Sequence, residues 1–543
     1  MRKNLLALFL VFTFILPYSA MAQTATKKKS AAMKASLNIT AKQLSDYLHF
    51  VASDAMEGRD TPSRGLDTTA EFIKMNLSSW GFKPAGDNGT FFQKISLRRE
   101  SIDPAATKLV VDGKEFTINE DFFRLGGNAS TGDVPIVFGG NGWMVKAKNI
   151  DALSGVDVKG KIVVFAGSGP GFSQQYMIPP PTGVTQADLK GTRGTDWADP
   201  IRNAQEKGAA GTIIIAPAQM MAFWDQVKNF FSRGTMFPEK LRAENAQAPN
   251  PMPVMLVSSK VSNALYGANA PTAAGALNKS GSLSAKSKTE TLMTQNVVAI
   301  WEGSDAVLKN EMVAIGAHYD HVGMNPNAPG EDKIWNGADD DGSGTVAVLG
   351  IAEALAKSPK RPKRSILFVW HAGEEKGLWG SEYFTKFPTV DITKVVAQLN
   401  IDMIGRSKKV GDTNPKNAEL SGENEIYVIG SKMMSTQLGA VTDNVNNSYL
   451  KMTYNYKYDD PKDPNRFFFR SDHFNYAVKG IPIVFWFDGV HEDYHGAGDH
   501  PDKIDYVKME KVTRTIFLTM WELGDAKTRP AIDKELPKEL TER

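Results

Sequence analysis

The second half of the chain alternates short apolar runs with helical patterns, and this alternation constrains the fold more than any other feature. Four runs rich in β-branched and aromatic residues read MVAIGAH, SILFVWH, VVAQLNI and IPIVFWF, with helical stretches such as GTVAVLGIAEAL between them. Runs that are apolar at nearly every position belong to strands buried on both faces. The pattern predicts an α/β domain whose mostly parallel, mixed sheet is flanked by helices.

The chain is long enough for more than one domain. It has 543 residues, whereas single hydrophobic cores stop growing near ~250–300 residues. The middle of the chain has a different sequence pattern. GKIVVFAGSG, DPIRNAQEKGAAG and TIIIAP read as strand, helix and strand, and the small polar residues 268–288 read as a loop that leaves this segment. We expect a main domain at 38–125 and 289–526, interrupted by a smaller α/β or β-rich domain at 126–288, and a charged tail at 527–543.

The N-terminus has the pattern of a secretory signal peptide. Basic residues at the second and third positions precede an apolar stretch, and Ala20-Met21-Ala22 forms a small-x-small cleavage motif. The apolar stretch is shorter than the ~20 residues of a membrane span. We expect residues 1–22 to be removed, residues 23–37 to form a flexible leader, and the exported protein to be periplasmic or extracellular, with no remaining membrane span.

Composition excludes several kinds of chemistry. The chain has no cysteine, so disulfides, thiol catalysis and sulfur-ligated zinc are excluded. Its 63 basic and 61 acidic residues form no long block of one sign, so the charge does not favour nucleic acid as a partner. Any metal must be held by His, Asp or Glu. Composition carries no information on the oligomeric state.

Polar side chains follow the predicted strands at the point where each strand ends. His318 ends MVAIGAH, Glu374 and Glu375 come just after SILFVWH, and Asp402 follows VVAQLNI. In open α/β sheets, ligands bind beyond the carboxyl ends of the strands. We therefore expect these side chains in one crevice, together with an acid triplet in NGADDDGSG.

So many acids in one crevice would repel each other unless they were protonated or neutralised by cations. Imidazole and carboxylate ligands without thiolate suit zinc, with manganese or cobalt as possible substitutes. Two zinc ions bring four positive charges, which three carboxylates and one hydroxide would cancel. The sequence therefore favours two Zn²⁺ per chain over one.

The motifs GAHYDH, NGADDDGSG, HAGEEKGLWGS, NIDMIG and DYHGAGDHPDKID, in this order, closely resemble the secreted co-catalytic zinc aminopeptidases, relatives of glutamate carboxypeptidase and the transferrin receptor. The resemblance covers about 295–525. SDAMEGRDTPSRG, near 53–65, resembles the N-terminal lead-in of that family, and the middle segment resembles the protease-associated domain inserted into this fold. The resemblance implies that this inserted domain covers part of the crevice.

The resemblance implies a role for each metal ligand. His318 and Asp402 would bind one zinc ion, and Glu375 and His495 would bind the other. Asp340, the middle acid of the triplet, would bridge both ions.

The resemblance also implies the catalytic groups. Glu374 would be the general base, which takes a proton from a zinc-bridged water and passes it to the leaving amine. Asp320 would fix the tautomer of His318. His473 is a possible substrate-binding residue or a structural one. The remaining members of the triplet, Asp339 and Asp341, would bond backbone or shape the loop. Four histidines would lie behind the ligands or at the surface: His321, His371, His491 and His500.

Together these features favour a dinuclear zinc metallopeptidase, an aminopeptidase that acts on peptides. Three alternatives stay open. A carboxypeptidase of the same family would need a basic residue for the substrate carboxylate, for which Arg406, Arg466 and Arg470 are candidates. A glutaminyl cyclase would use one zinc ion. A noncatalytic binding module would be expected to have lost ligands or the base, which this chain retains.

Overall fold

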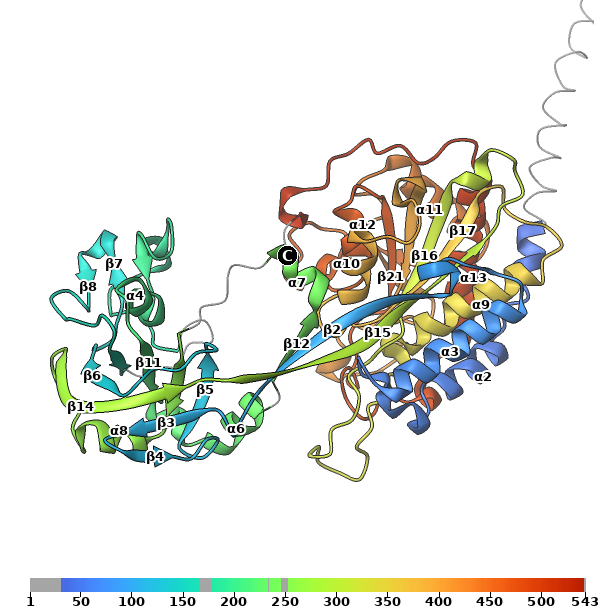
Figure 1. Ribbon diagram of the computed structural model, residues 1–543. Helices are drawn as coiled ribbons and strands as arrows, with labels where there is room; N and C mark the ends of the chain where they lie inside the picture. The colour runs from blue at the N-terminus through green and yellow to red at the C-terminus, as the bar shows by residue number, and fades with distance from the viewer. Residues whose placement is uncertain (1–30, 167–176, 233, 246–251, 542–543) are drawn as a thin grey trace, which may run out of the picture. The chain divides into compact units, whose positions relative to one another are not determined.

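The computed structural model describes residues 31–166, 177–232, 234–245 and 252–541, and its contacts divide the chain into two units (Figure 1). The first unit is Met1–Ile95 with Met293–Arg543, and the second is Ser96–Leu292. The second unit thus starts before residue 126, the start expected from the sequence, because strands that precede that residue pair within its own sheet.

The first unit is built on a mixed sheet, as predicted. Its order is β15-β17-β16-β18-β21-β19-β20. β16, β17, β18 and β21 run parallel, β15 is antiparallel to β17, and β19 is antiparallel to β21 but parallel to β20. All residues of the four central parallel strands are buried. The strands are β15 (Ser287–Trp301), β16 (Met312–His318), β17 (Ser365–His371), β18 (Val395–Ile401), β19 (Glu425–Ile429), β20 (Thr453–Asn455) and β21 (Ile483–Phe487). β1 (Lys83–Pro84) pairs with β15. β2 (Phe92–Ile102) begins in this unit, and its later residues, which belong to the second unit, pair with β12 (Thr235–Pro238).

Helices cover both faces of this sheet. Successive residues of a strand point to opposite faces, so Val313 and Ile315 join one apolar cluster while Met312 and Ala314 join the other. The helices of the first cluster are α2 (Ala41–Val51), α3 (Arg64–Ser79), α9 (Gly344–Ala356), α11 (Thr436–Ser448) and α13 (Tyr506–Asp525). Those of the second are α10 (Trp379–Lys386) and α12 (His473–Ala477).

The second unit has its own eight-stranded sheet, in the order β4-β3-β14-β6-β9-β11-β13-β5. The predicted strand, helix and strand are β9, α4 and β11. Residues 268–288 are not a loop throughout, because β14 lies within them and β15 begins there. The elements are β3 (Lys108–Val111), β4 (Lys114–Phe116), β5 (Phe122–Gly126), β6 (Val134–Phe138), β9 (Ile162–Phe165), α4 (Pro200–Glu206), β11 (Gly211–Ile215), β13 (Val254–Val257), α8 (Ser259–Tyr266) and β14 (Gly275–Ser284).

Parts of both chain ends pack against the folded protein. The expected signal peptide lies outside the described residues. Residues 31–36 are helical, and Ala32 and Ala35 pack into the core, so the predicted flexible leader is wrong for this stretch; alanine favours helix and allows close packing. At the other end, the backbone NH of Asp533 donates to Met434 O at 3.2 Å, and Leu540 is only 2% exposed, so the tail is docked.

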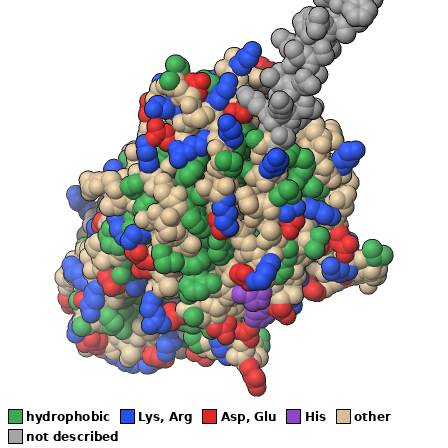
Figure 2. Space-filling view, turned by 90° about the vertical axis from the view of Figure 1, so that its right-hand side faces the viewer, with side chains coloured by type: hydrophobic (Ala, Val, Ile, Leu, Met, Phe, Trp, Pro, Cys, Tyr) green, Lys and Arg blue, Asp and Glu red, His purple; other side chains and the backbone are tan. Residues whose placement is uncertain are grey.

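Charges are mixed over the surface that Figure 2 shows, where basic and acidic side chains alternate with hydrophobic ones. This distribution agrees with the near balance of the formal charge. Among the residues that the structure describes, no helix combines the length and apolarity needed to cross a membrane.

Candidate metal centre and active site

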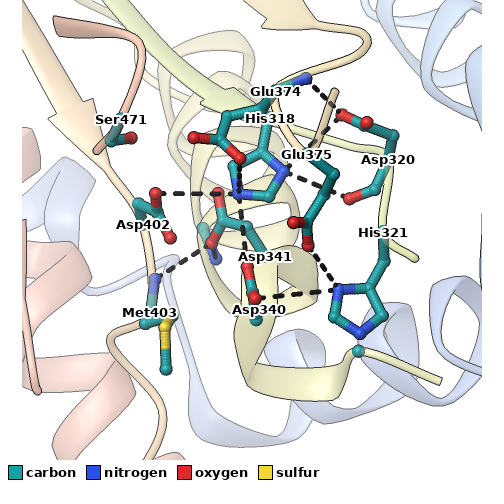
Figure 3. A network of polar contacts seen from close by, with 12 residues as sticks. His318, Asp320, His321, Asp340, Asp341, Glu374, Glu375, Asp402, Met403 and Ser471 are labelled. Carbon is teal, nitrogen blue, oxygen red and sulfur yellow. Dashed lines mark hydrogen bonds and ion pairs between the residues drawn. The ribbon is translucent and has the colours of Figure 1, made fainter. Parts of the chain in front are cut away.

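The expected ligands meet beyond the carboxyl ends of the central strands. His318 is the last residue of β16, Asp402 comes directly after β18, and Glu375 lies in the loop between β17 and α10. His495 lies in the segment after β21, and Asp340 lies in the turn before α9. The structure thus brings together all five residues that the sequence selected, and Figure 3 shows four of them around one point.

Asp340 stands between two groups of potential ligands. Its Oδ1 lies 3.3 Å from His318 Nε2, which in turn lies 3.6 Å from Asp402 Oδ2. Its Oδ2 lies 3.1 Å from His495 Nε2, which lies 3.0 Å from Glu375 Oε2. Within each group the potential ligand atoms lie within 4.8 Å of one another. One carboxylate therefore belongs to both groups.

A further histidine belongs to the second group. His321 Nδ1 lies 2.9 Å from Glu375 Oε1 and 3.8 Å from Asp340 Oδ2 (Figure 3). The sequence analysis placed this residue behind the ligands or at the surface, and it is completely buried. The one signal in the sequence is its position three residues after His318 in the same strand-end loop.

The acidic side chains of the site favour a bound positive charge. Burial lowers the pKa of His318, but Asp402 and Glu374 outweigh it and hold this pKa well above its usual range. Burial likewise opposes protonation of His495, yet the nearby carboxylates of Asp340 and Glu375 raise its pKa to about 10. Burial raises the pKa of Asp340, but the same two imidazoles bring it well below the usual range.

The neighbouring acids therefore favour the protonated form of these two imidazoles. Metal ions would take the place of those protons, because ligands bind metal in their deprotonated forms. Among the described residues, Glu375 Oε1 and His495 Nε2 are buried without a hydrogen-bond partner, which is unusual for buried polar atoms. The donor set of imidazole and carboxylate fits zinc.

Glu374 and Glu375 point to different places although they are neighbours. Glu374 Oε2 lies 3.9 Å from His318 Nε2, whereas Glu375 faces His321 and His495. The two residues lie in a loop, which permits this divergence. Burial, with the nearby charge of Glu375, raises the pKa of Glu374 well above its usual range, despite the opposing effect of His318. Such a carboxylate is suited to accept a proton near neutral pH.

Asp320 contacts both His318 and the loop of Glu374. Its backbone oxygen lies 3.1 Å from His318 Nδ1, closer than its carboxylate, which lies 3.6 Å away. The tautomer of His318 is thus set by the backbone oxygen of Asp320. The carboxylate instead accepts from the backbone NH of Glu374 at 3.2 Å and from Thr61 Oγ1 at 3.1 Å.

The outer acids of the triplet bond backbone, as predicted. Asp339 Oδ1 accepts from Gly405 N at 2.7 Å, and Asp341 Oδ1 accepts from Gly344 N at 2.8 Å and Met403 N at 3.1 Å. A buried acid that the sequence analysis missed, Asp499, accepts from the backbone NH groups of Asp339 and Asp340. Its signal was its place in the last motif, four residues after a predicted ligand.

The other histidines lie outside the two ligand groups. His371 Nε2 lies 3.0 Å from Tyr476 Oη, and His491 Nε2 lies 3.4 Å from Asp339 Oδ2; both residues are buried, so a surface position is wrong for them. His473 stacks on Phe485, with ring centroids 4.5 Å apart, and burial lowers its pKa to about 3. His500 is partly exposed and pairs with Asp332 at 3.1 Å.

A cavity adjoins the acids and has an apolar wall. Asp340, Glu374 and Asp402 form its polar side. Tyr494 also lines it and accepts a hydrogen bond from Arg470 Nη2 at 3.2 Å. The rest of the wall is aromatic or aliphatic and consists of Met403, Phe467, Phe485, Phe487 and Val490.

Comparison with known proteins finds relatives of the part of the chain that carries this centre. Residues 296–520 match the sequence model of Peptidase family M28. A probable leucine aminopeptidase of Arthroderma benhamiae is 28% identical over 228 residues, which are 40% of this chain and 55% of the relative. A probable zinc metalloprotease of Phaeosphaeria nodorum is 26% identical over 272 residues, 43% of this chain and 53% of the relative.

The chain spans about half the length of these curated relatives. Among solved structures, the aminopeptidase from Aneurinibacillus sp. strain AM-1 aligns with 93% of this chain and 98% of its own, at 16% identity and a TM-score of 0.48.

Proposed function

We propose that the protein is an exported zinc aminopeptidase that holds two metal ions and removes N-terminal residues from peptides. The observation that carries the proposal is the position of Asp340, whose two carboxylate oxygens face separate ligand groups beside Glu374. The family of residues 296–520 and the names of the relatives support the reaction class.

His318 and Asp402 would hold one ion, Glu375 and His495 the other, and Asp340 would contact both. Bound zinc would supply Lewis acidity, which lowers the pKa of a water molecule and polarises a carbonyl oxygen. Two ions would also supply the positive charge that these acids favour, since the acids raise the pKa of His318 and of His495.

Glu374 would move the proton. It accepts one from the attacking water as the water oxygen bonds to the peptide carbonyl carbon. The raised pKa of the carboxyl lets it retain that proton until the carbon–nitrogen bond breaks. It then gives the proton to the leaving amine and returns to its ionised form. Asp320 positions Glu374 through its backbone NH.

The cavity supports an aminopeptidase more than a carboxypeptidase. Its acids attract a substrate ammonium group and repel a carboxylate. Of the three arginines considered, Arg406 is bound to Asp493 at 2.9 Å, and Arg466 stacks on Phe469. Arg470 does line the cavity, and it is the group through which a C-terminal carboxylate would be recognised. The aromatic wall suits an apolar first side chain.

Two further parts of the proposal rest on the sequence. The signal-peptide pattern supports export to the periplasm or the medium. The second unit, Ser96–Leu292, is proposed to be a protease-associated domain, since it is inserted into the peptidase unit and has its own sheet. N-terminal sequencing of protein recovered outside the cytoplasm should begin at Gln23.

The test combines metal content with substrate choice. Purified mature protein should contain two zinc ions and hydrolyse leucyl peptides with a free N-terminus but not their N-acetylated forms. Glu374→Gln should keep both ions and lose roughly 10²–10⁴ in kcat. Glu382→Gln is the matched control, because Glu382 pairs with Lys386 on α10 outside the site. Cleavage restricted to blocked peptides with a free C-terminus would favour a carboxypeptidase acting through Arg470. One zinc ion and cyclisation of glutaminyl substrates would favour a cyclase, and binding without turnover a noncatalytic module.

A further inference from the structure

We propose that His321 is an additional metal ligand, which completes a four-residue set with Asp340, Glu375 and His495. This inference rests on the proposed function, because it assigns a residue to the metal centre of that site. It makes the two halves of the centre unequal: one half has four protein ligands, and the other has three, namely His318, Asp340 and Asp402.

The geometry places His321 with the second group. Its Nδ1 lies 2.9 Å from Glu375 Oε1, while the other oxygen of that carboxylate lies 3.0 Å from His495 Nε2. The two imidazoles approach with ring centroids 5.6 Å apart and an angle of 73° between the rings. Each of the four residues can offer one donor atom within 4.8 Å of the others. Two nitrogens and two oxygens are a common donor set for zinc.

The burial of His321 needs an explanation that a metal supplies. The side chain is completely inaccessible, and neither ring nitrogen makes a hydrogen bond of acceptable geometry to another described residue. His371 is also completely buried, but its Nε2 lies 3.0 Å from a tyrosine hydroxyl. A buried polar group without a partner is unfavourable by about 1–3 kcal/mol. A metal ion at Nδ1 would satisfy the nitrogen that faces the acids.

The position of His321 is built into the surrounding backbone. The backbone NH of His321 donates to Arg59 O at 3.1 Å. The guanidinium of Arg59 in turn donates to the backbone oxygens of Tyr319 and Gly337. Gly337 has φ +56°, and a Cβ at that position would overlap the ring of His321. The ring is therefore held in place by backbone contacts, as expected of a ligand positioned before the metal binds.

Unequal ligand sets have unequal consequences. A site with four protein ligands is closed when it is tetrahedral, whereas three protein ligands leave a position free for water or substrate. The ion held by His321 should therefore bind more tightly and exchange more slowly. The ion held by His318 and Asp402, which lie beside Glu374 and the cavity, would have the free coordination position.

The first experiment counts histidine ligands in the intact wild-type protein. X-ray absorption at the zinc edge of protein loaded with two ions should give three imidazoles per two zinc ions. Two imidazoles per two ions would overturn the inference while leaving the proposed function intact. Wild-type protein that binds fewer than two zinc ions would contradict the proposed function and the inference together.

The second experiment measures affinity with a competing chelator and zinc alone. His321→Ala should retain one ion with wild-type affinity and bind the other at least about tenfold more weakly, since even residues behind a ligand contribute 10–100-fold. His500→Ala is the matched control, because His500 lies in a nearby loop and pairs with Asp332; its two dissociation constants should equal those of the wild type. Unchanged constants in His321→Ala would overturn the inference. Circular dichroism verifies that the variant is folded. If His321→Ala does not fold, the number of imidazoles in the X-ray absorption spectrum of the wild type decides the inference.

Discussion

Arg59 provides the sharpest test of how the centre is supported. Its side chain is completely buried and makes four hydrogen bonds to backbone oxygens, at 2.7–3.0 Å: to Val51, Tyr319, Asn336 and Gly337. The oxygen of Tyr319 lies between His318 and His321, and those of Asn336 and Gly337 lie just before the acid triplet. We predict that Arg59→Met destabilises the first unit and loosens both loops.

The magnitude follows from these bonds and from the burial of the charge. Hydrogen bonds from a charged group contribute about 1.5–3 kcal/mol each, so the four bonds correspond to roughly 6–12 kcal/mol. Burial lowers the pKa of Arg59 from 12.5 to about 10, although nearby acids oppose this change. That difference corresponds to a penalty of about 3 kcal/mol for the charged form. Because methionine refills part of the volume, we expect a net loss of about 3–5 kcal/mol, the usual effect of removing one partner from a buried polar network.

Calorimetry on metal-free protein measures the effect without a contribution from zinc binding. The Tm of the first unit should fall by roughly 6–10 °C, at about 2 °C per kcal/mol for a large domain. Arg59→Lys keeps the charge but has fewer donors, so its Tm should lie between those of the wild type and Arg59→Met. Hydrogen exchange should become faster at the backbone NH groups of His321 and Gly323, which donate to Arg59 O and Gly58 O.

Arg364→Met is the matched control for this prediction. Arg364 is 1% exposed and binds Glu311 and two backbone oxygens, but it lies before β17, at the strand end opposite His371. It should lower the Tm without faster exchange at His321 and Gly323. A fall of less than about 2 °C in Arg59→Met, or equal exchange in the two variants, would refute the reasoning.

Three other predictions concern pH, metal and the C-terminal tail. Burial raises the pKa of Asp459 from 3.8 to about 6, although it accepts from Gly430 N; the folded state therefore binds more protons than the unfolded state between these values, and stability falls as pH rises through them. Asp459→Asn should remove that fall and be more stable than wild type at pH 7 by at most about 3 kcal/mol, and equal pH profiles would contradict the assignment. Dialysis against a chelator should lower the Tm of the first unit, and each tenfold increase in free zinc should restore about 1.4 kcal/mol per site; a Tm independent of zinc would count against the centre. Leu540→Ala should cost about 2 kcal/mol or more, whereas the control Ile532→Ala, at a side chain 56% exposed, should be neutral in the same melts, and equal melts would mean that the tail is not docked in solution.

The sheet and most of the centre could be predicted because their signals are local. A strand buried on both faces must be apolar throughout, so β16, β17, β18 and β21 are visible as runs. A polar residue just after such a run stands at the carboxyl edge of the sheet. The capping box at the start of α2 is equally local, because it needs only Thr40 and Gln43, three residues apart.

Elements stabilised by their neighbours were missed. β14 consists largely of small and polar residues, and its strand conformation comes from pairing with β3 and β6. Residues 31–36 read AAMKAS and carry no periodic run of large apolar residues, and the burial of Ala32 and Ala35 comes from their contact with the core. The early start of the second unit has the same cause, because β3 and β5 pair with β14 and β13, which are distant in sequence, and β4 pairs with β3.

The sequence by itself determined the chemical character of this protein: a chain without cysteine, with acids and imidazoles at the ends of buried strands. Only the tertiary structure decided which of these side chains share a site. It turned Asp320 toward the NH of Glu374, placed Asp499 under the acid triplet, and buried His321 beside Glu375. The physical reason is that ligation and hydrogen bonding depend on distances of about 3 Å between residues far apart in the chain, and those distances exist only when the loops are packed.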